Sequence, residues 1–257
     1  MSDSTLIGVI LTIIQVAVLL AVILPTARTM MRGKVTLISV FFCFAMGCFL
    51  LSNLYWVAYD CLRPDTRMPF AVNEFAECAM ILFLSAGLEK VLVDERNIAW
   101  EIIFSFLFIG ANIALWILWS GEWIQDILFG IPYVYFLWLL IRGIRSRNIL
   151  PKADRICIGA INILIIACEF AVLFADCPEN AMDIVIAVLT FGSLIWLLIR
   201  SVIHNDVFIA FAFYFFTILA MYSFGDPLYN VAMIANTVAI PLMYRSIKKE
   251  RNKDDLR

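Results

Sequence analysis

The chain has 257 residues, of which 63% are hydrophobic and 16% are charged, and its formal net charge is −2 at pH 7. Soluble domains have roughly 45–50% apolar and about 25% charged residues, and disordered or disulfide-rich chains have fewer apolar side chains or many more cysteines. These figures exclude a soluble globular enzyme, a disordered chain and a disulfide-stapled secreted domain. Together with a mean hydropathy of +0.94, they predict a polytopic membrane protein that has the lipid bilayer as its partner and binds no nucleic acid.

Hydrophobic runs long enough to cross a bilayer recur along the whole chain. A bilayer core of roughly 30 Å requires about 20 apolar residues in a helix. Transmembrane strands would instead require segments of about ten residues that alternate in polarity, and unbroken apolar runs such as 102–109 and 207–216 exclude them. The predicted fold class is an all-α transmembrane helix bundle with nine spans, in chain order at residues 4–26, 34–59, 69–92, 98–119, 126–145, 156–175, 183–202, 207–223 and 228–247.

Two short connections decide how the last third of the chain folds. If His204-Asn205-Asp206 were helical, residues 183–223 would form one helix of about 60 Å, twice the thickness of a bilayer core. We therefore predict a hairpin at these residues. Gly225-Asp226-Pro227 would make the matching turn on the opposite side of the membrane, because glycine is permissive and proline ends or begins helices.

The loops carry an orientation signal, because Lys and Arg are retained on the cytoplasmic side of short loops. When the predicted loops are taken alternately, all of the 19 Lys and Arg residues except Arg63 and Arg67 fall on one side. The N-terminus is therefore predicted outside and the C-terminus in the cytoplasm, which requires an odd number of spans. The short loops favour a bacterial cytoplasmic membrane, that is, a plasma membrane.

Residues 1–247 are predicted to form a single transmembrane domain, and residues 248–257 a short charged cytoplasmic tail that extends the ninth helix. Of the seven cysteines, only Cys61 and Cys177 fall in predicted outer loops, and their spacing leaves open whether they form a disulfide. A single histidine and the lack of a CxxC or Cys/His pattern exclude the usual zinc geometries. We expect no metal site of this kind and no cofactor.

Ionisable groups within a membrane helix are costly and mark functional sites. Glu74 and Glu77 lie in the third predicted span, one to two turns from its outer end, and share one helix face with Asn73. In one interpretation these side chains bind a ligand or an ion. In the other they are structural and pair with the counter-ions Arg63 and Arg67, which precede the same helix.

Two further spans carry polar stripes. Asn162 and Glu169 in the sixth span recur at an interval of seven residues that Asp176 continues, and seven residues on a helix fall nearly on one line. Asn53 and Asp60 repeat this interval in the second span. Because polar groups gain nothing from facing lipid, both stripes are predicted to face the bundle interior, either as ligand-binding residues or as interhelical hydrogen bonds.

Most acidic residues fall on the outer half of the predicted topology, and a cleft lined by one sign of charge concentrates counter-ions. We therefore predict an outward-facing anionic pocket for a cation or a cationic small molecule, in which the three intramembrane glutamates converge. Its ligand-binding residues are predicted to be Glu74, Glu77, Asn73, Glu169, Asn162, Asn53 and Asp60.

Three function classes fit these features to different extents. A ligand-binding or sensory module fits the anionic mouth, and it would require a cytoplasmic signalling partner because the chain has no kinase, cyclase or nucleotide-binding motif. A small proton- or cation-coupled secondary transporter fits the glutamate pair, although the polar groups crowd the outer half and not the midplane. An intramembrane hydrolase has the least support, because no GxSxG, HExxH or metal-ligand cluster is present. We favour the sensory module and assign no catalytic residue.

Overall fold

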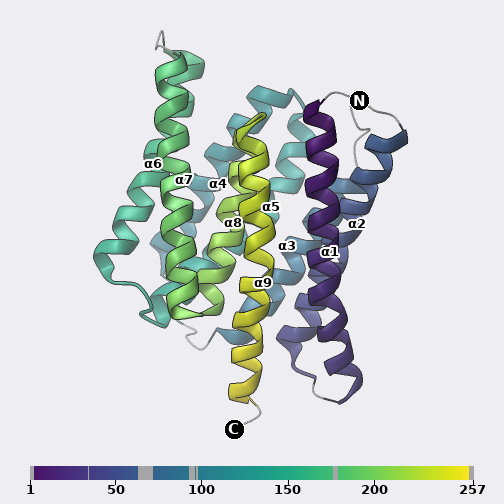
Figure 1. Cartoon of the computed structure of the whole chain (residues 1–257). Helices are drawn as coiled ribbons and strands as arrows, with labels where there is room; N and C mark the ends of the chain where they lie inside the picture. Colours follow the sequence, from purple (N-terminus) through teal and green to yellow (C-terminus); the bar gives the residue numbers. More distant parts are fainter. Residues whose placement is uncertain are drawn as a thin grey trace. The chain divides into compact units, whose positions relative to one another are not determined.

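The structure is a computed structural model that describes residues 3–33, 35–62, 72–92, 96, 98–175 and 179–254. Within these residues the fold is all-helical, with no strand (Figure 1). The all-α fold class is therefore confirmed for the described chain. The nine helices are α1 (Asp3–Met31), α2 (Leu37–Leu62), α3 (Val72–Val91), α4 (Ala99–Ser120), α5 (Trp123–Ser146), α6 (Lys152–Phe174), α7 (Glu179–His204), α8 (Val207–Ser223) and α9 (Leu228–Asp254).

The helices follow the predicted order, and several continue beyond the apolar runs that predicted them. α6 begins at Lys152, four residues before the predicted start, and α9 continues to Asp254, so the charged tail extends the last helix as expected. The extra turns of α6 and α9 carry charged residues and are nevertheless helical. Hydropathy thus located the apolar part of these two helices and missed their polar ends.

Within the described residues, six helices are long and apolar enough to cross a membrane by length and composition, namely α1, α2, α4, α5, α6 and α7. The apolar helix α8 is shorter, with 17 residues. α3 includes the charged residues Glu74, Glu77, Glu89 and Lys90, and α9 has a low mean hydropathy. The structure therefore supports a helical membrane protein, while nine spans and their orientation stay predictions.

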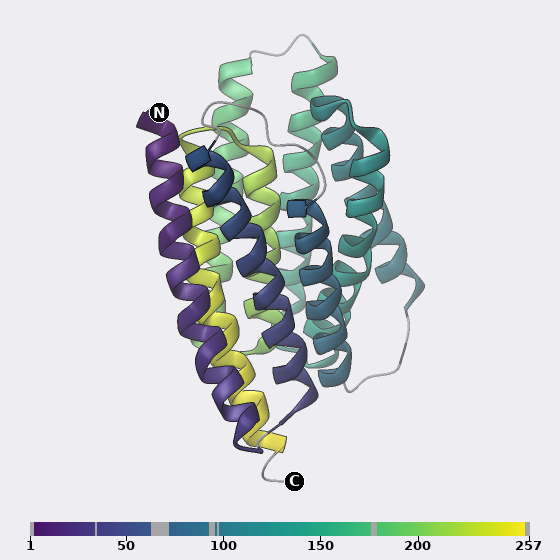
Figure 2. The ribbon, with the colours of Figure 1, turned by 90° about the vertical axis from the view of Figure 1, so that its right-hand side faces the viewer.

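The described chain divides into two compact units, which are treated separately here. The first contains Met1–Leu92 and Thr217–Arg257, and hence α1, α2, α3, the end of α8 and α9. In this unit α2 packs along α3, α1 contacts both α2 and α9, and α2 also contacts α9. Figure 2 shows α1, in purple, beside α9, in yellow. This unit therefore brings the first and the last helix of the chain together.

The second unit contains Val93–Phe216, and hence α4, α5, α6, α7 and most of α8. α4 packs on α5 and α6 packs on α7, whereas α4 and α6 touch over a smaller area. Every residue of Val207–Phe215 is buried, as expected for a helix that is apolar on all sides. Asp206 caps this helix, because its Oδ1 accepts a hydrogen bond from the backbone N–H of Phe208 at 2.8 Å. The predicted break between the seventh and eighth helices is confirmed.

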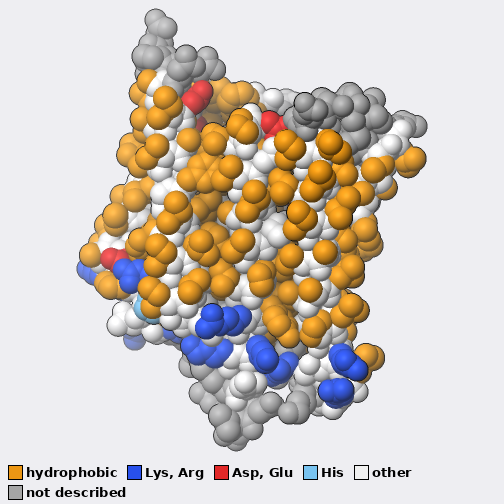
Figure 3. Space-filling view, in the orientation of Figure 1, with side chains coloured by type: hydrophobic (Ala, Val, Ile, Leu, Met, Phe, Trp, Pro, Cys, Tyr) orange, Lys and Arg blue, Asp and Glu red, His pale blue; other side chains and the backbone are white. Residues whose placement is uncertain are grey.

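The surface is dominated by apolar side chains. Figure 3 shows hydrophobic side chains over the visible faces of α1, α7 and α9, with Lys and Arg side chains gathered near the lower ends of α1 and α9. Leu24 on α1 and Ile184 on α7 are among the large apolar residues that are exposed. Contiguous exposed apolar surface is typical of a protein that contacts lipid. Whether residues 1–247 act as one transmembrane domain stays a prediction.

Candidate functional site

A cavity of about 170 Å³ lies within the first unit, among α1, α2, α3, α8 and α9. Its residues recur at helical spacing, since Phe49, Ser52, Asn53 and Trp56 are three or four positions apart and share one face of α2. Glu77 is the one charged residue in the described lining. The full lining consists of Gly8, Thr12, Gln15, Phe49, Ser52, Asn53, Trp56, Glu77, Met221, Tyr229 and Met233.

Neutral hydroxyl groups hold the half-buried Glu77 carboxylate. Tyr222 Oη on α8 donates to Glu77 Oε2 at 2.5 Å. Ser52 Oγ donates to Glu77 Oε1 at 3.3 Å and also to Asn73 Oδ1. Among the described residues no Lys or Arg lies within ion-pair distance of Glu77. The carboxylate is therefore positioned by three helices without a cationic partner from the described chain.

The amide donors around the cavity are already engaged within the protein. Gln15 Nε2 donates to the side chains of Asn236 and Thr237, at 2.9 and 3.0 Å. Asn53 Nδ2 donates to the carbonyl of Phe49 at 2.9 Å. No described residue donates to Gln15 Oε1 or Asn53 Oδ1. The polar groups that remain at this cavity are therefore mainly oxygen acceptors.

A buried hydrogen-bond network behind the cavity fixes the orientation of Gln15. Asn236 on α9 is fully buried, accepts the bond from Gln15 and donates through Nδ2 to Thr217 Oγ1 at 3.0 Å. Thr217 on α8 is also fully buried, and Gln15 is 1% exposed. Because an unpaired polar group is costly in this environment, the network keeps the amide nitrogen of Gln15 turned toward α9.

The structure brings together three of the predicted site residues. Glu77 and Asn53 line the cavity. Asn73 is not in the lining, but it accepts a hydrogen bond from Ser52, which is in the lining. Glu74 is half-buried on the same helix and is not among the lining residues.

The remaining predicted residues are placed elsewhere or are not described. Asp60 belongs to α2, but its side chain lies outside the described part of the structure, and so do Arg63 and Arg67. The counter-ion hypothesis therefore stays a prediction. Asn162 and Glu169 lie on α6 in the second unit. Whether they share a site with Glu77 also stays a prediction.

Several residues of this site were not predicted from the sequence, because the prediction rested on acidic residues and on polar residues that repeat every seven positions. Gln15 and Thr12 lie three residues apart within the most apolar span, and both are buried. Polar groups inside such a run were the signal that could have identified α1 as a wall of the site. Serine and tyrosine are common in membrane helices, so the residue types of Ser52 and Tyr222 did not indicate that they belong to a site.

Comparison of the chain with protein-family models, with curated proteins and with solved structures finds no match in any of the three. The functional argument therefore rests on the geometry of the site.

Proposed function

We propose that this protein is a ligand-binding, sensory module of the plasma membrane whose Glu77 cavity takes a small organic cation. The observation that carries the proposal is a carboxylate that lines a cavity in an apolar helix bundle, accepts hydrogen bonds from the hydroxyls of Ser52 and Tyr222, and has no described Lys or Arg within ion-pair distance. An ionised carboxylate that leaves water is costly unless it is paired. A bound cation would provide the pairing that no described Lys or Arg provides.

The donor and acceptor pattern supports a cationic ligand over an anionic or neutral one. The amide nitrogens of Gln15 and Asn53 are engaged within the protein, and their oxygens accept no hydrogen bond from described residues. Thr12 Oγ1 likewise donates to the carbonyl of Gly8, at 2.9 Å. A ligand that fits these acceptors must donate hydrogen bonds or carry positive charge.

Size and aromatic content support an alkylammonium ion over a bare metal ion. The cavity of about 170 Å³ equals five to six water molecules at roughly 30 Å³ each, which is more than an alkali ion needs. Phe49, Trp56 and Tyr229 are in the lining, and aromatic faces attract alkylammonium groups through cation–π interactions. A methylated ammonium with few carbons fits both properties.

Sensing is the activity that the arrangement supports best. α9 lines the cavity through Tyr229 and Met233 and continues as one helix to Asp254. A ligand that moves this helix would change the position of its charged end, where a cytoplasmic partner could bind. In this proposal the chain supplies the binding site and the partner supplies the output.

The proposal is tested by thermal unfolding of the purified full-length protein in detergent, titrated with tetramethylammonium chloride. Sodium chloride at the same ionic strength provides the baseline. A ligand at 100 times its Kd stabilises the folded state by about 2.7 kcal/mol, so a saturable rise in Tm is expected for the wild type. Glu77→Gln is expected to remove this rise. Glu89→Gln removes the same charge from the exposed end of α3 and is expected to retain it.

Two results would contradict the cation site. One is a Glu77→Gln variant that is stabilised as strongly as the wild type. The other is a wild type that neither tetramethylammonium chloride nor methylammonium chloride stabilises above the sodium chloride baseline. Counterflow of labelled tetramethylammonium into liposomes that contain the protein would instead assign transport to the same site.

A further inference from the structure

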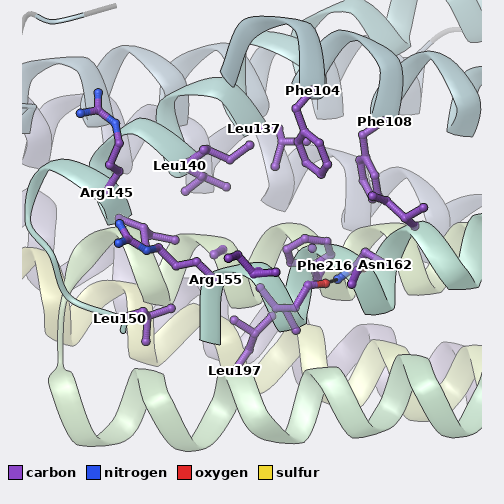
Figure 4. A pocket seen from close by; sticks show the side chains of 18 of the residues that line it. Phe104, Phe108, Leu137, Leu140, Arg145, Leu150, Arg155, Asn162, Leu197 and Phe216 are labelled. Atoms are coloured by element: carbon purple, nitrogen blue, oxygen red, sulfur yellow. Dashed lines mark hydrogen bonds between the residues drawn. The ribbon is translucent and has the colours of Figure 1, made fainter. Parts of the chain in front are cut away.

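The second unit contains a larger cavity of about 520 Å³, lined mainly by α4, α5 and α6, with one residue from α7 and two from α8. This volume falls within the range of about 300–1,000 Å³ that is typical of small-molecule sites. The walls are almost entirely apolar and include Phe104, Phe108, Leu137, Leu140 and Phe216. Figure 4 shows these side chains around the central space, with Arg145 and Arg155 toward one end and Asn162 toward the other. The cavity is therefore amphipathic along its length.

The basic end of the cavity has three basic side chains and a tryptophan in its lining. Arg145, Lys152 and Arg155 are in the lining, and so is Trp100, which is 54% exposed. Tryptophan concentrates at the level of lipid head groups, where its apolar ring and polar N–H are both accommodated. This end of the cavity thus has the composition of a membrane interface.

Two acidic residues in the described part of this unit, Glu101 and Asp154, are already paired with arginines. Glu101, which is fully buried, pairs with Arg145, whose Nη2 also donates to the carbonyl of Arg96 at 3.1 Å. Asp154 pairs with Arg200 at 2.7 Å.

Unlike Arg145 and Arg200, Lys152 and Arg155 have no ion-pair partner among the described residues. The two side chains are therefore available to an anion at the mouth of the cavity.

The cavity can hold part of an acyl chain and has an apolar rim. Arg155 and Asn162 are seven residues apart on α6, or about 10 Å at 1.5 Å per residue, and one leaflet of a bilayer core is about 15 Å thick. Ile156 and Ile163 line the cavity and are 62% and 53% exposed. Exposed apolar rim residues indicate that the cavity opens toward lipid and not toward water.

We propose that this cavity binds an anionic phospholipid, with the phosphate at Lys152 and Arg155 and one acyl chain along Phe104, Leu137 and Phe108. Basic pockets between transmembrane helices are known to hold anionic head groups. A neutral lipid would leave the two cations without a counter-charge, and a water-soluble phosphate would leave the apolar walls unoccupied. The site lies within the second unit and does not depend on the cation site proposed for the first.

The test is native mass spectrometry of the full-length protein with added palmitoyl-oleoyl phosphatidylglycerol, compared with phosphatidylcholine of the same chains. At least tenfold tighter binding of phosphatidylglycerol is expected. Each basic residue near an anionic membrane surface contributes roughly fivefold to binding, so the double variant K152Q/R155Q is expected to lose about 25-fold for phosphatidylglycerol. Its binding of phosphatidylcholine is expected to be unchanged.

A second pair of variants tests whether the acyl chain of the lipid occupies the apolar part of the cavity. A Cβ at Gly159, which lines the cavity, or at Gly192 on α7 would meet no atom within 4 Å. Gly159→Phe fills the cavity and is expected to weaken phosphatidylglycerol binding at least tenfold. Gly192→Phe adds the same side chain outside the cavity and is expected to have no effect.

Three outcomes would overturn the proposal. The first is equal binding of the two lipids by the wild type. The second is wild-type binding of phosphatidylglycerol by K152Q/R155Q, which keeps the test informative if Gly159→Phe does not fold. The third is displacement of the lipid by millimolar glycerol phosphate, which would assign a soluble phosphate ligand to the basic end.

Discussion

Replacement of Asn236 by alanine tests whether the buried network shapes the cation cavity. Asn236 is fully buried, accepts from Gln15 at 2.9 Å and donates to Thr217 at 3.0 Å. Interhelical hydrogen bonds in membrane proteins average about 0.6 kcal/mol, and a buried group left without a partner costs about 1–3 kcal/mol. Gln15 keeps its bond to Thr237, so we expect Asn236→Ala to lower the free energy of unfolding by about 2 kcal/mol.

The same substitution is expected to weaken cation binding. Without Asn236, the amide of Gln15 loses one of the two bonds that turn its nitrogen toward α9, and the amide can rotate its N–H groups toward the cavity. The Gln15 oxygen, which can accept a hydrogen bond from the ligand, is then replaced at the cavity by an N–H group, which cannot. The loss of one such contact, worth about 1 kcal/mol, corresponds to roughly fivefold weaker binding of methylammonium, whose N–H groups can donate to the Gln15 oxygen.

The assay is a double-mutant cycle of Gln15→Ala and Asn236→Ala, with unfolding followed by SDS titration in mixed micelles. A coupling free energy of about 0.6–1.7 kcal/mol is expected for a direct interhelical bond. Asn230→Ala, on the same helix, removes an exposed bond to Asp226 and is expected to cost less than about 0.5 kcal/mol. A coupling free energy of zero would contradict a direct bond between Gln15 and Asn236. Equal losses of unfolding free energy for Asn236→Ala and Asn230→Ala would contradict a stabilising role of the buried network.

Two further predictions concern the second unit and use the same unfolding assay. A Cβ at Gly143 would overlap the ring of Phe208, which is fully buried. Gly143→Ala is therefore expected to destabilise by about 1–3 kcal/mol, whereas Gly110→Ala, where a Cβ meets nothing within 4 Å, is expected to stabilise by up to about 1 kcal/mol. Glu101→Gln leaves Arg145, which is 22% exposed, without its charge partner and is expected to cost about 3 kcal/mol; a loss below about 0.5 kcal/mol would contradict a structural role for this pair.

The order of the helices could be predicted from the sequence because hydropathy and turn chemistry act locally. The break at residues 204–206 followed from a length argument, and Asp206 makes the break by capping α8. The ends of the helices could not be predicted in the same way. The polar turns at the start of α6 and the end of α9 are helical because neighbouring turns continue the hydrogen-bond ladder, and hydropathy does not report this.

The candidate site could be predicted only in part, because intervals along one helix do not give contacts between helices. Depth and charge predicted Glu77 as a site residue, and spacing predicted that Asn73 shares its helix face. No pattern in the sequence paired Glu77 with Tyr222, which is 145 positions away. The bond between Gln15 and Asn236 joins the first helix to the last, and such long-range partners emerge only from packing.

Two of the helices that carry the site, α3 and α9, have an average composition that argues little for a membrane span. The average is lowered by charged residues, among them Glu77 on α3 and those in the last turns of α9. The outer faces of the two helices are apolar, since Val231, Ile234 and Val238 on α9 are exposed at helical spacing. A helix with an apolar outer stripe and a polar inner stripe meets the requirements of lipid contact on one side and of a binding site on the other. The prediction that α3 and α9 are spans therefore depends on the exposed face of each helix and not on its average composition, because only an outward face would contact the hydrocarbon.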